Sequence, residues 1–596
     1  MPQSRRVTLE VWRDRAVLFS LFSFVWLGLG NHSAFAQVRI PVRPDQTPPS
    51  RQIQPEPELP PAPEEVLPPP EQLIPQPPDA ETPSEEIPLT LVVERFEVVG
   101  STVFTQAEFD QKLREKGLIG VPLPFSRILE AADVVTEMYV SQGYITSGAY
   151  IPADQSTGVN INDPEPQQAV IQIQVVEGAI ADQNIQISGL KQLRPNYIRS
   201  RVARYTKAPI RYDRLLEGLQ LLRLDPQVQD ISAELTPDVR PGQSILKLTV
   251  VERQPFTMDF ALDNRRSPSV GSFRRVVQVN HANLLGYGDG ISLAYTNTDG
   301  SNALDFNYTI PINARNGTIS LSVGASDSEV IEDPFNVLDI TSNSYYLDLN
   351  YRQPILQSPS REVALGVTFS RRWTRAELLG GLVAFPSIGA DADGITNLTA
   401  LRFVQEAVWR SNVEVIALRS QFSVGLDLFN ATINDDAPDS QFFAWRGQAQ
   451  WVRLLAPETL LVLRGDVQFS NQSLLSIEQF GLGGLDTVRG YRQDALLGDN
   501  GFLVSAEVRF PLVRLPDQEG VLQIAPFVDF GTVWNGSDFA NPDPSTLASV
   551  GVGLRFNLGD RLSARFDWGI PLVDVPGEKN TWQENGLYFS VNYRLF

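Results

Sequence analysis

GFLVSAEVRF, residues 501–510, shows the pattern that decides the fold of the C-terminal part of the chain. Every second position is apolar: Phe502, Val504, Ala506, Val508 and Phe510. The positions between them include Ser505, Glu507 and Arg509. Because successive side chains of a β-strand point to opposite sides, this stretch predicts a strand with one apolar and one polar face. Residues 550–558 and 562–570 repeat the pattern, with Arg555, Arg565 and Asp567 on the polar face.

Sixteen alternating segments of this kind follow Pro255, separated by turns that contain Gly, Asn, Asp and Pro. Such a series fits either a soluble sandwich, which hides its apolar face, or a membrane barrel, which turns that face to lipid. The even number of segments, the absence of cysteine, the final aromatic residue Phe596 and an N-terminal export signal favour the barrel. We therefore predict a mainly β protein in which residues 256–596 form a 16-stranded antiparallel transmembrane β-barrel.

Residues 1–36 have the features of a secretory signal peptide. Arginines at positions 5, 6, 13 and 15 precede an apolar run at 16–30, and Ala34-Phe35-Ala36 supplies a cleavage site. A transmembrane helix is the alternative, but this run is short for ~30 Å of hydrocarbon. Residues 37–88 hold 17 of the 44 prolines and are predicted to be a disordered acidic linker, because proline removes a backbone donor.

Two copies of one β-α-α-β-β unit are predicted between this linker and the barrel, at residues 89–178 and 179–255. Each copy begins with a strand that ends at a glycine, Gly100 or Gly189, and finishes with a strand that ends in Val-Glu. Apolar residues at helical spacing indicate two helices in each copy. The open edge of each small sheet is available to pair with an extended partner chain.

The composition argues against several classes of function. The 596-residue chain has a formal net charge of −21, which is unsuited to gripping nucleic acid. It has no cysteine and only two histidines, His32 and His281, and neither stands near a cluster of other ligands. We therefore predict no catalytic residues, no metal site and no cofactor, and we predict that the protein is not an enzyme.

The second unit carries a run of basic residues with few acids among them: Lys191, Arg194, Arg199, Arg201, Arg204, Lys207, Arg211 and Arg214. A solvated helix face is the ordinary interpretation of such a run. The alternative is a surface that contacts an acidic or polar client, or lipid headgroups.

Two motifs carry a specific resemblance. Val488-Arg489-Gly490-Tyr491 stands between two predicted strands, and Phe527-Val528-Asp529-Phe530-Gly531 lies on the thirteenth. Behind two β-α-α-β-β units, they resemble the outer-membrane transporters of two-partner secretion, the haemolysin secretion/activation (ShlB/FhaC/HecB) family of the POTRA-barrel superfamily. The resemblance covers about residues 89–596, with further matches at Leu224-Asp225-Pro226, Pro241-Gly242-Gln243-Ser244, Asp263-Asn264 and residues 283–289.

The resemblance implies a transporter in the outer membrane of a Gram-negative-type bacterium, with both POTRA domains in the periplasm. These domains would bind an unfolded haemagglutinin- or haemolysin-like exoprotein, which would pass through the barrel to the cell surface. Outer-membrane lipid and the barrel-assembly machinery would be the other partners, and nucleic acid would not be one. The alternatives are an assembly factor of the same superfamily that inserts barrel proteins into the membrane, and a passive porin or adhesin, which lacks POTRA repeats.

The two motifs are also complementary in their chemistry. The resemblance places Arg489 on the sixth extracellular loop, which folds back into the barrel, where a guanidinium loses hydration and needs a carboxylate. Alternation turns the side of the thirteenth strand that bears Phe527, Asp529 and Gly531 toward the lumen. We therefore predict that Arg489 pairs with Asp529 and holds the loop against the inner wall.

The neighbouring residues have expected roles in the same arrangement. Gly490 is expected to allow a close backbone approach and Tyr491 to pack beside it, while Glu507 and Arg509 extend the network. Two features depart from the family pattern. Residues 37–88 are too rich in proline for the pore-plugging helix, and Phe596 stands one residue out of phase with the apolar face of the last strand, so recognition of the chain end is expected to shift.

Overall fold

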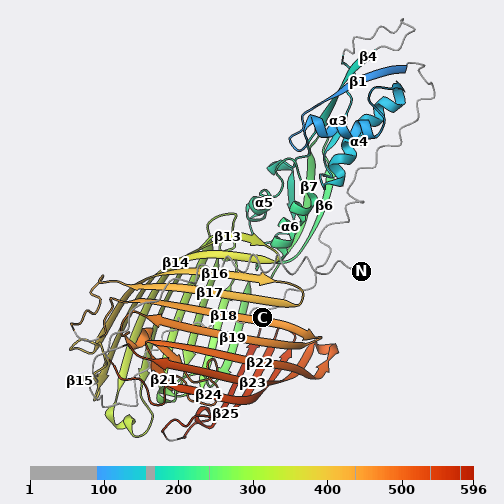
Figure 1. The fold of residues 1–596 in the computed structure, drawn as a ribbon. Helices are drawn as coiled ribbons and strands as arrows, with labels where there is room; N and C mark the ends of the chain where they lie inside the picture. Colours follow the sequence, from blue (N-terminus) through green and yellow to red (C-terminus); the bar gives the residue numbers. More distant parts are fainter. Residues whose placement is uncertain (1–89, 156–167, 241, 436–437, 537–538, 578) are drawn as a thin grey trace.

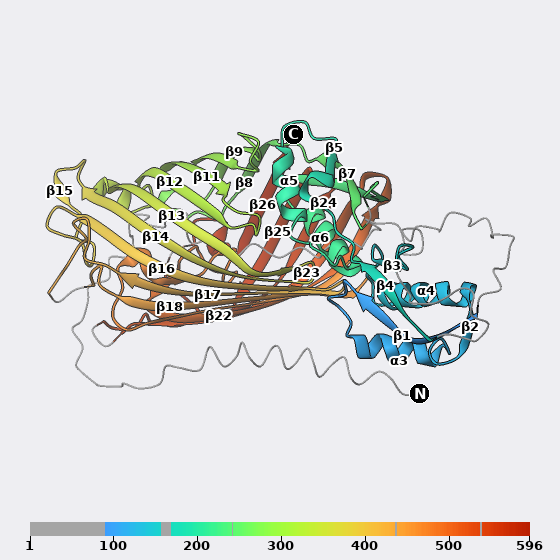
Figure 2. The same cartoon turned by 90° about the horizontal axis from the view of Figure 1, so that it is seen from above.

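The computed structural model describes residues 90–155, 168–240, 242–435, 438–536, 539–577 and 579–596. The predicted signal peptide and linker, and with them the plug helix, lie outside the described residues. Figure 1 shows two small α/β modules in a row at one end of a large β-barrel. Seen from above, the second module lies against the barrel and the first projects away from it (Figure 2).

The first module contains a four-stranded sheet covered by two helices. Its elements are β1 (Thr90–Val99), α3 (Gln106–Glu115), β2 (Pro122–Pro124), α4 (Phe125–Ser141), β3 (Gly148–Tyr150) and β4 (Gln168–Val176), with sheet order β2-β1-β4-β3. Phe96, Phe109 and Tyr139 are among the side chains that fill its core. Relative to the predicted order there is one additional three-residue strand, β2, which pairs with β1 just before α4 begins.

The second module repeats the plan with three strands. Its elements are β5 (Ile185–Ser188), α5 (Pro195–Val202), α6 (Tyr212–Arg223), β6 (Val228–Pro237) and β7 (Ser244–Glu252), with sheet order β5-β7-β6. Apolar side chains from both helices and all three strands form one core. In both modules the first and last strands pair in parallel.

The internal repeat has a shared local cause. Gly100 and Gly189 both have positive φ, +89° and +84°, and each lies against a valine carbonyl of the module's last strand. A Cβ at Gly100 would stand 2.6 Å from the Val175 oxygen, which no L side chain tolerates. A glutamate at or just after the end of this strand then binds the segment that follows the glycine. Glu177 accepts from the Thr102 N–H at 2.6 Å, and Glu252 accepts from three successive N–H groups at residues 191–193.

The two modules meet without a spacer. The Gly178 carbonyl at the end of the first module accepts the Ile210 N–H at 3.1 Å, and the Gly143 carbonyl accepts the Tyr212 N–H at 2.9 Å. These backbone hydrogen bonds join residues of the first module to the start of the second module's second helix. They therefore restrain the relative orientation of the two modules through the main chain.

The barrel is built from sixteen antiparallel strands, each paired with its neighbours in sequence order. They are β8 (Phe256–Asp263), β9 (Arg274–His281), β10 (Gly290–Asn297), β11 (Ser301–Pro311), β12 (Thr318–Glu329), β13 (Thr341–Ser358), β14 (Arg361–Leu378), β16 (Ile395–Arg410), β17 (Glu414–Gly425), β18 (Phe443–Ala456), β19 (Thr459–Ser470), β22 (Asn500–Leu515), β23 (Gly520–Trp534), β24 (Thr546–Leu558), β25 (Leu562–Pro571) and β26 (Leu587–Arg594). The two-residue β15 (Val383–Ala384) pairs with the end of β14, which itself pairs with β16. The predicted mainly β fold with a 16-stranded barrel is confirmed.

The barrel closes where β26 pairs with β8, over the registers Ser590↔Asp263 to Arg594↔Asp259. Asn264 reinforces this seam, since its side chain donates to the Leu587 carbonyl at 2.9 Å and accepts from the Phe589 N–H at 2.9 Å. The last strand ends at Arg594, so alternation no longer governs Phe596. Its ring lies 6.2 Å from that of Phe256 at the outer surface, and the predicted phase shift does not turn it away from that face.

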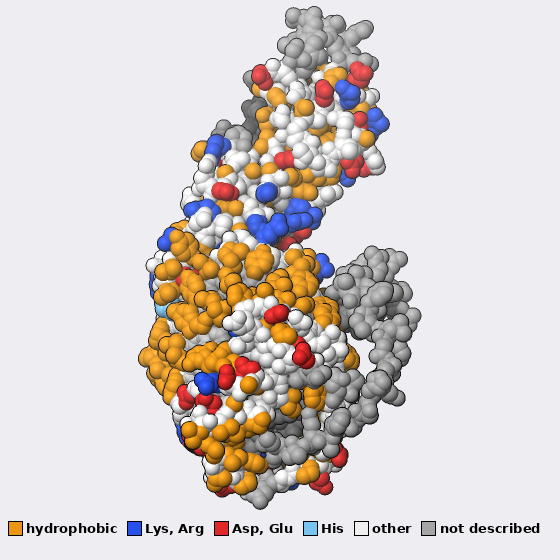
Figure 3. Space-filling view, turned by 90° about the vertical axis from the view of Figure 1, so that its left-hand side faces the viewer, with side chains coloured by type: hydrophobic (Ala, Val, Ile, Leu, Met, Phe, Trp, Pro, Cys, Tyr) orange, Lys and Arg blue, Asp and Glu red, His pale blue; other side chains and the backbone are white. Residues whose placement is uncertain are grey.

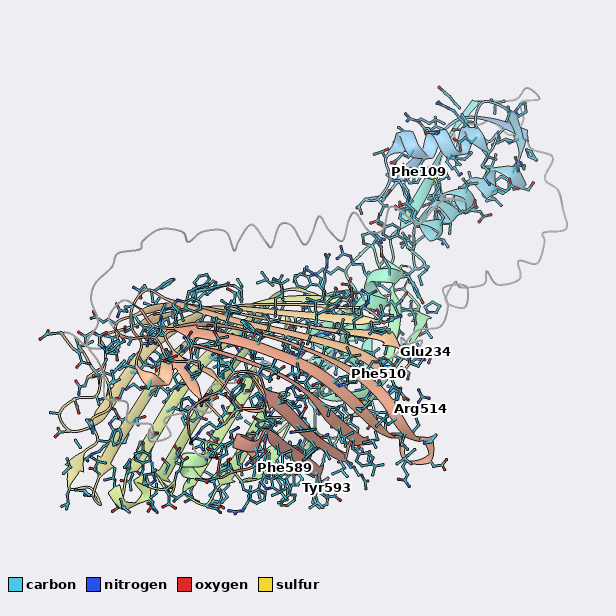
Figure 4. All side chains as sticks on the ribbon, turned by 60° about the horizontal axis from the view of Figure 1, so that its bottom comes forward. Phe109, Glu234, Phe510, Arg514, Phe589 and Tyr593 are labelled. Carbon is cyan, nitrogen blue, oxygen red and sulfur yellow. The ribbon has the colours of Figure 1, made fainter. Side chains whose placement is uncertain are left out.

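The outer surface of the barrel is apolar and the inner surface is polar. On β22 and β23 the exposed residues include Phe502, Val504, Val528 and Phe530, whereas Glu507 and Asp529 are buried. Figure 3 shows hydrophobic side chains covering much of the barrel surface. Phe510 and Tyr593, labelled in Figure 4, are exposed residues of this face. This is the inverted distribution expected of a barrel surrounded by lipid.

The structure shows a third role for part of the basic run. The Arg194 guanidinium stacks on the Tyr287 ring, 3.8 Å from its centroid, in the turn between β9 and β10. Arg201 donates to the Asn316 side chain at 2.8 Å, and Arg204 donates to the Ala314 carbonyl at 3.1 Å. These arginines therefore hold the second module on the turns at the near end of the barrel, where Figure 3 shows basic side chains gathered.

No helix among the described residues has the length and hydropathy of a membrane-spanning segment.

We expect Gly100→Ala to destabilise the first module by about 1–3 kcal/mol, because the new side chain combines a strained φ with a backbone clash. Gly117→Ala is the matched control, since Gly117 also has positive φ (+70°) but has open space around the position of a Cβ. Hydrogen exchange of the β1 and β4 amides in the full-length protein measures the difference. Equal protection in the two variants would refute the steric argument.

Candidate functional site

The connection between β19 and β22, residues 471–499, folds into the barrel. Its two arms pair through β20 (Phe480–Leu482) and β21 (Leu496–Gly498). Side chains of the loop pack with residues of the barrel wall in one buried cluster: Phe480, Leu482, Val488, Tyr491, Leu496, Leu503, Val533 and Leu547. The loop is therefore part of the barrel interior, and we call it the infolded loop.

Arg489, at the tip of the infolded loop, is buried among acidic side chains of the wall. Its Nε lies 2.7 Å from Asp529 Oδ2 and its Nη2 lies 2.9 Å from Asp529 Oδ1, a bidentate pair. The Arg489 N–H also donates to Asp529 at 3.1 Å. Asp529 is 0 % exposed and Arg489 is 3 % exposed, so both charges have lost nearly all their water. A bidentate pair of this kind fixes the position of the loop tip in addition to stabilising it, because the planar guanidinium accepts one arrangement of the carboxylate.

Three more strands contribute charges around Arg489. Glu507 on β22 accepts from Arg489 at 2.6 Å, and Asp567 on β25 lies 3.2 Å from it. Arg555 on β24 bridges the same two carboxylates at 2.8 and 2.7 Å. Two further arginines complete the group. Arg509 lies 2.8 Å from Glu507, and Arg565 contacts Asp567.

The cluster therefore contains four guanidinium groups and three carboxylates, linked by ion pairs into one network. The low dielectric of a buried site makes an unpaired charge costly, and here every carboxylate faces at least one arginine. The Arg489 guanidinium also stacks on the Phe527 ring, 3.3 Å from its centroid, which screens one face of the cation from water. Removal of Arg489 would leave carboxylates with fewer partners rather than simply delete a contact.

Gly490 and Tyr491 fix the backbone beside Arg489. Gly490 has φ of +102° and lies against Gly569 of β25. A Cβ on either glycine would come close to the backbone of the opposite segment. Its N–H donates to the Tyr588 hydroxyl at 2.8 Å. Tyr491 reaches past this point, and its hydroxyl donates to the Ala548 carbonyl at 2.8 Å and accepts the Val573 N–H at 3.1 Å.

The structure brings together all nine residues singled out in the sequence. Val488 lies in the apolar cluster, and Gly531 leaves room for Leu482, whose side chain would stand 2.8 Å from a Cβ there. Sequence reasoning omitted Asp567, Arg555 and Arg565 from the site, although alternation had already assigned all three to the polar face. It also omitted Tyr588 and Ser505, whose hydroxyl donates to Asp529 at 2.7 Å.

The acidic residues of this site do not form a metal centre. Within the described residues, no group of three or more His, Cys, Asp or Glu side chains is arranged to hold a metal ion. The carboxylates of the site are instead engaged by arginines. The arrangement fits a mechanical role, the attachment of a loop to a wall.

Comparison with known protein families gives the site its context. The model of the family described as haemolysin secretion/activation protein ShlB/FhaC/HecB matches residues 242–556. The model of the POTRA domain, ShlB-type, matches residues 91–178, which contain the first module. The chain belongs to the ShlB/FhaC/HecB family. The arginine cluster therefore lies in the barrel of a member of this family.

Individual relatives agree with the family. The outer membrane transporter CdiB of Escherichia coli is 25% identical over 80% of this chain and 78% of that protein. The heme/hemopexin transporter protein HuxB of Haemophilus influenzae is 20% identical over 74% of this chain and 76% of that protein. The solved structure of CdiB from Escherichia coli covers 88% of this chain and 93% of that one, with a TM-score of 0.64 and 21% identity, and so shares the fold.

The Arg489–Asp529 pair is expected to be strongly coupled. A double-mutant cycle of Arg489→Gln and Asp529→Asn should give a coupling of about 0.5–3 kcal/mol, because Arg489→Gln leaves Asp529 without its arginine and Asp529→Asn removes the bidentate partner of Arg489. The measurement is the free energy of unfolding of each variant, from urea titrations of the barrel folded in lipid vesicles. Additive effects of the two substitutions would contradict the pairing argument.

Proposed function

We propose that this protein carries an unfolded secreted protein from the periplasm through its barrel to the cell surface. The protein is an outer-membrane transporter of two-partner secretion, as its family and relatives show. The observation that carries the proposal is the combination of POTRA modules held at one mouth of a barrel with a loop attached inside its lumen. The client is proposed to be a haemagglutinin- or haemolysin-like exoprotein.

The modules offer sheet edges to such a client. Among the described residues, β2 and β3 are the edge strands of the first sheet, and β5 and β6 those of the second. An extended chain satisfies its own backbone groups by pairing with an edge of this kind. Glu234 of β6 lies at the surface of the second module, 3.2 Å from Lys247 of β7 (Figure 4).

A cavity lies where the second module meets the barrel lumen. It has a volume of about 610 Å³ and is lined from the module by Tyr197, Arg201 and Leu224, and from the barrel by Thr309, Arg352 and Arg410. Both apolar and charged side chains border it, which suits a polypeptide of mixed sequence. We propose that a client segment leaves the modules through this cavity.

The direction of transport is proposed to come from folding outside the cell. The sequence carries no recognisable nucleotide-binding motif. A client that folds after emerging is too large to slide back, so each folded portion would retain the progress already made. The barrel-assembly machinery and outer-membrane lipid are proposed as partners in the biogenesis of the barrel rather than in transport.

Loss of this gene is expected to remove one large protein from the culture medium. The measurement is a comparison of secreted proteins between the parent strain and the deletion strain. Deletion of residues 90–252, with the barrel retained in the outer membrane, should give the same loss because the client no longer reaches the pore. Missing barrel proteins in the outer membrane, with an unchanged medium, would instead indicate an insertion factor.

Arg489→Ala is expected to reduce the secreted amount about tenfold or more, since the loop tip loses its buried attachment. Arg514→Ala is the matched control, because Arg514 lies on the same strand as Glu507 but is exposed, near the barrel end that faces the modules (Figure 4). Immunoblots of medium and envelope fractions measure secretion and barrel content. Normal secretion by Arg489→Ala would exclude the tip attachment from transport.

A further inference from the structure

The infolded loop has a second charged attachment, far from Arg489. Glu478, at the start of the loop's first arm, faces Arg402 of β16 in bidentate geometry, with oxygen–nitrogen distances of 2.6 and 3.0 Å. Arg402 is also held by the hydroxyls of Ser370 and Ser423, at 3.2 and 3.0 Å. These contacts orient the guanidinium from the side of the wall.

An apolar contact accompanies this charge pair. Leu474, Leu475 and Ile477 of the same arm are buried against the barrel wall. Their partners are residues of β16 and the start of β18 together with the residue before it: Leu398, Ala400, Phe442 and Ala444. The first arm is therefore seated on one part of the wall by both charge and burial.

The two attachments lie far apart around the barrel. In chain order β16 is the eighth of the sixteen strands, whereas the strands that bind Arg489 are the twelfth, thirteenth and fifteenth. The loop also reaches a third place, since Arg492 pairs with Glu332, in the connection between β12 and β13, at 2.8 Å. A loop held at such separated points crosses the lumen rather than lining one wall.

The two attachments differ in strength. Arg489 faces three carboxylates and its side chain is 4 % exposed, whereas Arg402 faces Glu478 with both side chains 12 % exposed. Between them lies a glycine-rich segment in which Gly483 and Gly484 have φ of +104° and +103°. Glycine tolerates the largest changes of backbone conformation, so this segment is where the two parts of the loop are free to move apart.

We propose that Arg402 and Glu478 form a second anchor that positions the infolded loop across the lumen, and that this anchor opens while Arg489 stays bound. The pore then widens on the side of β16. Transport of a client is the proposed function on which this role rests, but the anchor itself is tested without a client.

Single-channel recordings of the purified full-length protein in phosphatidylcholine bilayers test the proposal. Arg402→Gln and Glu478→Gln should each make large-conductance openings about tenfold or more frequent, because a charge-assisted bidentate pair is lost. Arg372→Gln is the matched control, since Arg372 also forms a bidentate pair, with Asp348 at 3.0 and 2.9 Å, but this pair joins two wall strands. The exchange of Arg402→Glu with Glu478→Arg should restore infrequent opening.

Thiol labelling shows which part of the loop moves. The chain has no cysteine, so Ile477→Cys or Val488→Cys introduces a single reporter in the first arm or at the tip. In the Arg402→Gln background, a maleimide should label position 477 about tenfold faster while position 488 stays protected. Faster labelling at both positions, or at neither, overturns the proposal, as does an opening frequency equal to that of Arg372→Gln. None of these outcomes depends on whether a client is secreted.

Discussion

A backbone that crosses hydrocarbon must satisfy its hydrogen bonds within itself, and the architecture of this protein follows from that constraint. A sheet meets it only by closing, which here depends on the short pairing of β26 with β8 and on the side chain of Asn264 across the seam. In the closed barrel the alternating pattern places phenylalanine and valine side chains toward lipid and charged side chains toward the lumen, the reverse of a soluble protein. The polar lumen is thus a product of the same constraint that builds the barrel.

A polar lumen filled with arginine and carboxylate creates the chemistry that holds the loop. Around Arg489, four guanidinium groups and three carboxylates come from the loop and from four strands, and each carboxylate is paired with at least one guanidinium group. On the wall itself, Glu507 and Asp567 already contact arginines of the strands. Asp529 is paired by Arg489, so the loop supplies the cation that completes the group. The stacking of Arg489 on Phe527 and the contact of Gly490 with β25 then fix the loop tip in one position on the wall.

The sequence predicted much of this because its signals were local and periodic. Alternation located all sixteen strands and assigned Glu507, Asp529, Arg555 and Asp567 to the inner face, and the Gly and Val-Glu positions marked the repeated modules. What it could not supply was information about which residues meet across the barrel. Glu478 and Arg402 are 76 positions apart and carry no shared motif, and the docking of Arg194 on Tyr287 depends on how two domains face each other. Short β2 went unnoticed because two of its three residues are prolines.

The junction between the two modules has a mechanical consequence. Main-chain hydrogen bonds from Gly178 and Gly143 leave no swivel there, and arginines 194, 201 and 204 clamp the second module to the barrel rim. The periplasmic part is therefore attached rigidly to the barrel at one end and is free at the other. A force on the free end is transmitted as a torque to the turns at the mouth of the pore. The orientation of the sheet edges relative to that mouth is determined when the chain folds.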